Sequence, residues 1–303
     1  MAKLSPMMVE YKKTKEQYPD CILFYRLGDF YEMFFEDAVT VSRELSLTLT
    51  GKECGLEERA PMCGVPYHAV ESYLTKLVQK GYKVAIAEQM EDPKLAKGLV
   101  RREVIRVVTP GTLTSSQALD ETKNNFLMGI VYLGDCFGIA SCDITTGDFF
   151  VTEVQSEREL LDELAHFTPS EIVCNQAFFM SGIDMDELKN RCQAYISALD
   201  PRFFSDDGCR RILKEHYRVA SLDGLGLGDC PTGVIAAGAV MQYMYETQKS
   251  DLSHITSITP YSTGQYMVLD VSTRRNLKLL ETLREKQKRG TLLWVLDKTR
   301  TAM

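Results

Sequence analysis

With 303 residues, 45% of them hydrophobic and 25% charged, the chain exceeds one typical domain and predicts an ordinary soluble protein of two or three domains. No run approaches the roughly 20 apolar residues of a membrane span, and the polar start is no signal sequence, so we expect a cytoplasmic protein. The net charge of −7 is concentrated in residues 113–250, with 10 basic and 21 acidic residues, which argues against that part as a DNA surface.

The first elements alternate between helix and strand. Ser5-Pro6 predicts the start of a helix over residues 6–17, because serine favours the N-cap and proline the first turn. Residues 21–26 are rich in isoleucine, leucine and aromatic residues and predict a strand that a Gly28-Asp29 turn ends. After the segment that follows this turn, apolar residues at helical spacing predict a short helix from near Asp37.

The segment after the turn carries an unusual pair of residues. An extended backbone places Phe30 and Glu32 on the same face. An ionised carboxylate is rarely buried unpaired, so if Glu32 reaches water or a polar partner, Phe30 is exposed as well. An exposed phenylalanine beside a carboxylate matches the apolar wedges that unstack a DNA base step. The alternative is that Phe30 lies in the core, because six of the twelve residues 24–35 are aromatic. The pattern leaves both interpretations open.

Two basic residues of the first domain are candidate contacts for DNA phosphates. A strand is predicted over residues 47–50, and Lys52 opens the polar loop that follows it. A helix over residues 70–78 and strands over 83–89 and 103–108 complete the domain. Arg102 lies where the loop opened by Asp92-Pro93 re-enters the last strand. The alternative for Lys52 is a solvated surface side chain.

A second domain follows residues 113–124, which have the composition of a linker. Three strands within residues 126–154, then a helix and a strand, predict an RNase H-like domain over residues 125–247 that a long apolar helix closes. Such folds include nucleases that hold two metal ions with clustered carboxylates. Asp143 is a candidate for that role, and the alternative is a solvent-facing carboxylate in a turn.

The remaining chain predicts helices and no metal centre. Residues 266–270 are expected to be extended, and a helix with a basic end is expected from Ser272. Another helix is expected from Thr291, and no stop signal follows it. Residues 248–303 are therefore expected to be the truncated start of an all-α domain. Nine cysteines without a CxxC pair and four separated histidines predict reduced thiols and no metal site.

Five segments together resemble the MutS family of DNA mismatch-repair proteins over the whole chain. These segments are Phe24-Tyr25-Arg26-Leu27-Gly28-Asp29-Phe30-Tyr31-Glu32, Pro61-Met62-Cys63-Gly64-Val65-Pro66-Tyr67-His68-Ala69-Val70-Glu71, Val107-Val108-Thr109-Pro110-Gly111-Thr112, Asp143-Ile144-Thr145-Thr146-Gly147 and Thr273-Arg274-Arg275-Asn276-Leu277. The resemblance implies an α/β protein with a mixed-sheet mismatch-recognition domain over residues 1–112, an RNase H-like connector over 125–247 and the start of a helical core. It also implies that Phe30 stacks on a mispaired base and that Glu32 hydrogen-bonds to it.

The resemblance further implies mismatched double-stranded DNA as the ligand, a homodimer, nucleoid association on DNA, and a MutL-type repair partner that contacts the connector domain. The family's ATP and magnesium site lies in a domain beyond this segment. Gly51-Lys52 is the only Gly-Lys pair and precedes glutamate, so the chain has no GxxxxGK[ST] motif. We therefore expect no catalytic residue, cofactor or ATPase activity here, and a metal-dependent nuclease is the alternative function.

Overall fold

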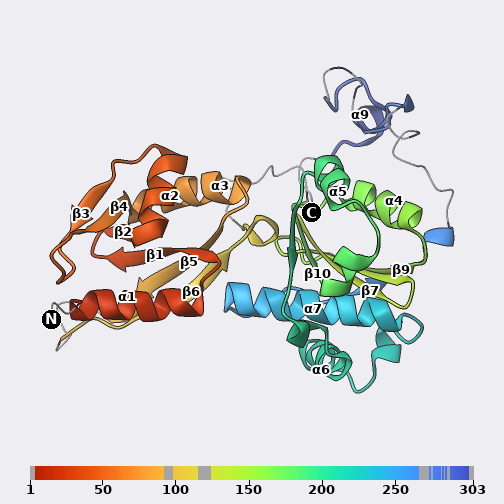
Figure 1. Ribbon diagram of the computed structural model, residues 1–303. Coiled ribbons are helices and arrows are strands. Elements are labelled where there is room, and N and C mark those ends of the chain that lie inside the picture. Colours follow the sequence, from red (N-terminus) through yellow and green to blue (C-terminus); the bar gives the residue numbers. More distant parts are fainter. Residues whose placement is uncertain are drawn as a thin grey trace. The chain divides into compact units, whose positions relative to one another are not determined.

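The computed structural model describes residues 4–91, 98–114, 124–265 and, further on, 273, 276–280, 282, 284 and 287–299. The chain forms two compact units (Figure 1). The first comprises Met1–Ala118 with Met244–Asp251, and the second comprises Leu119–Tyr243 with Leu252–Met303. No helix among the described residues has the length and apolar character needed to cross a membrane.

The first unit is built on a six-stranded mixed sheet in the order β3-β4-β2-β1-β5-β6. Its strands are β1 (Cys21–Leu27), β2 (Phe30–Phe34), β3 (Thr50–Lys52), β4 (Ala60–Pro66), β5 (Lys83–Gln89) and β6 (Arg102–Val108). Its helices are α1 (Pro6–Gln17), α2 (Phe35–Leu45) and α3 (Val70–Gln79), with short 3-10 turns at Tyr67–Ala69 and Pro110–Thr112. Helix α1 covers one face of the sheet, and α2 and α3 cover the other (Figure 1).

One predicted boundary in this unit is wrong, for a local backbone reason. The strand expected over residues 47–50 is β3, which begins only at Thr50. Ser42 accounts for the difference, because its carbonyl accepts the backbone N–H of Leu47 at 3.0 Å and its hydroxyl donates to the carbonyl of Leu47 at 2.7 Å. Helix α2 begins at Phe35, within two residues of the predicted start near Asp37, and Phe35 makes the turn into it at φ 55°.

The second unit contains the predicted meander and crossover. Its sheet has the order β11-β10-β7-β8-β9-β12, in which β7, β8 and β9 are antiparallel and β10 and β11 continue in parallel beside β7. The strands are β7 (Phe126–Leu133), β8 (Cys136–Asp143), β9 (Phe149–Val154), β10 (Glu171–Cys174), β11 (Tyr195–Ala198) and β12 (Thr259–Pro260). Two mixed sheets with helices on their faces confirm the predicted α/β class.

Helices cover both faces of this second sheet (Figure 1). They are α4 (Glu157–Phe167), α5 (Met185–Cys192), α6 (Asp206–Tyr217) and α7 (Pro231–Gln248), with 3-10 turns at Gln176–Met180, Pro201–Phe204, Leu222–Leu225 and Thr263–Gln265. Helix α7 approaches the sheet closely where β8 carries Gly138. A Cβ atom on Gly138 would lie 2.7 Å from the backbone nitrogen of Gly233 and closer still to the carbonyl of Thr232. Glycine is therefore required for this approach.

Several predicted elements lie partly or wholly outside the described residues. These are the loop at Asp92-Pro93, most of the 113–124 linker, the extended segment 266–270 and the start of the helix expected from Ser272. The helix expected from Thr291 is α9 (Leu292–Leu296), where the Thr291 hydroxyl accepts the Trp294 N–H at 3.1 Å. It ends at Leu296, because Asp297 takes an extended conformation.

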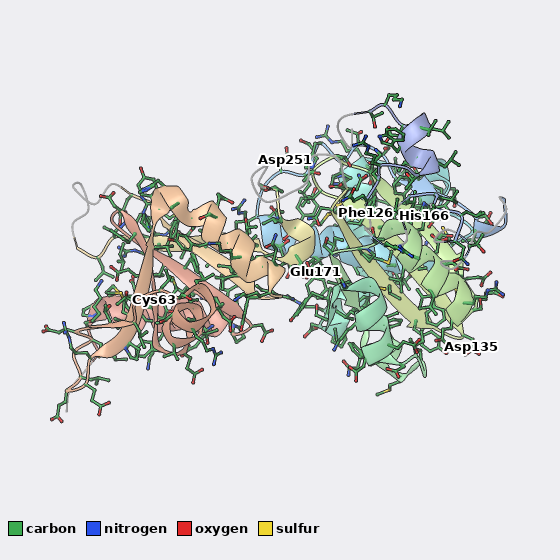
Figure 2. All side chains as sticks on the ribbon, turned by 90° about the horizontal axis from the view of Figure 1, so that it is seen from above. Cys63, Phe126, Asp135, His166, Glu171 and Asp251 are labelled. Atoms are coloured by element: carbon green, nitrogen blue, oxygen red, sulfur yellow. The ribbon has the colours of Figure 1, made fainter. Side chains whose placement is uncertain are left out.

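All nine cysteines lie within the described residues, and none of them forms a disulfide there. Cys63 lies inside the first unit (Figure 2). Its thiol donates to the carbonyl of Ala38 at 3.4 Å. Burial raises the pKa of Cys63 to about 11. Within the described residues, no three histidine, cysteine or acidic side chains gather where they could hold a metal ion.

Candidate nucleic-acid interface

The β1–β2 hairpin presents Phe30 to solvent. Gly28 takes φ 60° in the turn, a conformation that glycine adopts without a Cβ penalty, and Leu27 pairs with Phe30 directly after it. The Phe30 side chain is 46% exposed, whereas its neighbour Tyr31 on the opposite face is 5% exposed. Phe30 is therefore not a core residue, which contradicts the alternative interpretation of the aromatic cluster.

The far end of the same strand is anchored in the core. Phe34 is 1% exposed and contacts Tyr11 of α1 edge to face, with ring centroids 4.9 Å apart. Asp37, just beyond the strand, accepts the backbone N–H of Leu23 at 2.9 Å and the ammonium of Lys15 at 2.9 Å. Strand β2 thus has one end buried in the core and the other exposed. The core contacts hold the backbone that carries the exposed Phe30 ring.

Gly64 of β4 lies beside both Phe30 and Glu32. It is the register partner of Glu32, and a Cβ atom on Gly64 would lie 3.6 Å from Cγ of Glu32 and 3.8 Å from Cδ1 of Phe30. The two side chains therefore share one side of the hairpin, as their spacing predicts. A side chain at position 64 would therefore contact both residues, and glycine avoids this.

Glu32 forms an ion pair with Lys52. The ammonium lies 2.5 Å from Oε2 of Glu32, and the exposed fractions of the two side chains are 33% for Lys52 and 16% for Glu32. Strand β4 lies between β3 and β2, so the lysine reaches across one strand to its partner. The same ammonium lies 5.6 Å from the ring centroid of Phe34. The structure thus brings together three of the four predicted site residues.

The opposite side of the hairpin is braced by polar contacts that the sequence did not indicate. The Tyr31 hydroxyl donates to the carboxylate of Glu88, and the Arg26 guanidinium lies 3.3 Å from that carboxylate. Burial and the Glu88 contact raise the pKa of Tyr31. Arg26 also lies 4.0 Å from the ring centroid of Tyr67, whose backbone N–H donates to the Asp29 carbonyl in the turn at 2.9 Å. These contacts fix the orientation of the turn that carries Phe30.

Arg102 has structural partners in this unit. Its Nε donates to the carbonyl of Arg26 at 2.7 Å, its Nη1 donates to the carbonyl of Val100 at 2.8 Å, and the guanidinium lies 5.2 Å from the ring centroid of Tyr25. A guanidinium committed to backbone carbonyls has fewer donors left for a phosphate. These contacts favour a structural role over the predicted phosphate contact.

Asp143 is not a solvent-facing turn carboxylate, so that interpretation of it is wrong. It is fully buried and accepts hydrogen bonds from the backbone and hydroxyl of Thr145 at 2.8 and 2.6 Å and from Asn124 and the Asn125 backbone at 2.9 Å each. Among the described residues, Asp143 belongs to no group of three acidic, histidine or cysteine side chains that could hold a metal ion. The arrangement gives the nuclease hypothesis no support.

Comparisons with known proteins agree over the entire chain. The family model for MutS domain I matches residues 5–117, and that for MutS domain II matches residues 125–256. The DNA mismatch repair protein MutS of Lachnoclostridium phytofermentans is 64% identical over 303 residues, which are 100% of this chain and 32% of that protein. The MutS proteins of Acetivibrio thermocellus and Ruminiclostridium cellulolyticum are 53% and 52% identical over 306 residues, again over 100% of this chain and 35% of each relative. The chain thus spans about a third of the length of the curated relatives that it matches.

Proposed function

Because the chain belongs to the MutS family, with domains I and II in sequence, we propose that its first unit recognises mismatched base pairs in double-stranded DNA. Phe30 is proposed to insert at the mispaired base, and Glu32 to accept a hydrogen bond from the displaced base. The observation that carries this proposal is the exposed Phe30 ring beside Glu32 on a braced hairpin. An apolar wedge of this kind unstacks a base step, and a mismatched step resists unstacking less than a paired one.

Replacing Glu32 tests the proposal, because the change should raise the affinity for one duplex and lower it for another. A carboxylate near phosphates weakens binding to any duplex, so Glu32→Ala should raise affinity for fully paired DNA. The same change removes the acceptor for the displaced base and should lower affinity for a G·T mismatch, by about 1 kcal/mol or more. In a gel-shift titration of the complete protein, the ratio of the affinities for mismatched and fully paired DNA should therefore fall, because both affinities change toward each other. Unchanged affinities for both duplexes would show that Glu32 does not read the base.

Further parts of the proposal rest on family membership rather than on the geometry. They are a homodimer, and contact between the second unit and a MutL-type repair partner. The acidic excess of residues 113–250 supports a protein-facing role for that unit, because duplex binding requires clustered cations. We also propose that residues 1–303 neither bind nor hydrolyse ATP, since they lack a phosphate-binding GxxxxGK[ST] motif. ATP turnover by these residues alone would contradict this.

A further inference from the structure

The Glu32–Lys52 ion pair places a cation on the carboxylate that is proposed to read the base. Among the described residues, Lys52 donates to Glu32 and has no other hydrogen-bond acceptor. The Lys52 ammonium compensates the negative charge of Glu32 and occupies its Oε2 atom. A displaced base must compete with Lys52 for that carboxylate, so the ion pair bears directly on recognition.

We propose that Lys52 determines specificity by exchanging partners. It holds Glu32 in the free protein and on fully paired DNA, and it moves to a DNA phosphate when a displaced base donates to Glu32. This inference rests on the proposed function and adds a second residue to the reading of the base. Lys52 thus acts on recognition in two ways, by holding Glu32 when no base is displaced and by contacting a phosphate when one is.

The energetics of the pair suit an exchange. The two side chains are joined by a single contact and the lysine is 33% exposed, so a phosphate oxygen can reach the ammonium and replace the carboxylate as its partner. Lysine carries its charge on a flexible stem, and Lys52 ends the short edge strand β3, next to a run of exposed residues over 55–59. The ammonium can therefore move without a change in the sheet.

The exchange also favours mismatched DNA. On a fully paired duplex no base offers a hydrogen bond to Glu32, so the departure of Lys52 would leave an uncompensated carboxylate near phosphates. At a mismatch, the displaced base replaces Lys52 as the partner of Glu32, and the freed ammonium gains a phosphate. Lys52 is thus expected to contact phosphate only where a base has been displaced.

The salt dependence of binding measures this difference. Each phosphate neutralised by a protein cation contributes about −0.9 to the slope of log K against log salt concentration. In the complete protein, Lys52→Met should make that slope shallower by about 1 for a duplex with one G·T mismatch, and leave it unchanged for the fully paired duplex. In a Glu32→Gln background Lys52 has no carboxylate to hold it, so Lys52→Met should make the slope shallower on both duplexes.

A matched control comes from another lysine pair of the same unit. Lys80 contacts Glu44 at 2.9 Å and is also partly exposed, so Lys80→Met removes an equivalent charge away from the hairpin and should change neither slope. Equal changes on both duplexes for Lys52→Met alone would make Lys52 an ordinary phosphate contact, and no change on either would make the pair structural. Either outcome overturns the exchange. Failure of the proposed function is separate, because it would appear as a wild-type protein without mismatch preference.

Discussion

Replacing Phe30 by alanine in the complete protein should abolish its preference for mismatched over fully paired duplex and leave its melting temperature almost unchanged. The Phe30 ring is 46% exposed and packs on no core, so its removal takes little apolar area out of the fold. Substitutions at such positions change the free energy of unfolding by about 0.5 kcal/mol or less. Competition gel shifts with G·T and fully paired duplexes, together with thermal unfolding, measure both effects.

The matched control for this variant lies four residues along the same strand. Phe34 is 1% exposed against Tyr11, so Phe34→Ala should lower the free energy of unfolding by about 3–5 kcal/mol. If Phe30→Ala lowers the melting temperature as much as Phe34→Ala, Phe30 is a core residue. If Phe30→Ala keeps the full preference for mismatched duplex, Phe30 has no part in recognition.

Gly138→Ala should strongly destabilise the second unit. The added Cβ atom meets the backbone of Thr232 and Gly233 at the start of α7, and a backbone segment inside a packed helix has no rotamer with which to move away. The helix must shift from the sheet, at a cost of about 3 kcal/mol. Urea unfolding followed by far-ultraviolet circular dichroism measures this loss.

Gly224 supplies the control for that substitution. A Cβ atom at Gly224 would meet no atom within 4 Å, so Gly224→Ala should be close to neutral. If the two variants unfold at the same urea concentration, the close approach of α7 to β8 is not a stability requirement. The two midpoints therefore test the packing of this sheet without reference to DNA binding.

The fold was most predictable where one local pattern decided it. The spacing of Leu74, Leu77 and Val78 predicted α3, and the run over 83–89 predicted β5 with the observed bounds. Prediction failed where a side chain redirected the backbone, as Ser42 does by its hydrogen bonds to Leu47 ahead of β3. Strand β11 was missed because its four residues, Tyr-Ile-Ser-Ala, contain no apolar run like the Ile-Val-Cys of the equally short β10.

The candidate site was predictable along one strand but not across strands. The two-residue period placed Phe30 and Glu32 on one face, and the structure agrees. That Lys52 is the partner of Glu32 depends on the strand order β3-β4-β2, which no local sequence pattern predicts. The braces Arg26 and Glu88 were missed for the same reason, because 62 residues separate them in sequence. Asp143 was misjudged because its acceptor role depends on Asn124 and Asn125, which precede a different strand.

The most direct test of the account asks which nucleotide Phe30 contacts. We would replace Phe30 by the photoreactive analogue p-benzoylphenylalanine in the complete protein, irradiate it with a duplex carrying one G·T mismatch, and map the crosslinked nucleotide. The same substitution at Val39 of α2, which is 45% exposed, serves as the control. The account predicts crosslinks from position 30 at the mispaired nucleotide or its stacking neighbour, and few from position 39. Crosslinks from position 30 that spread along the duplex, or that form equally on fully paired DNA, would contradict it.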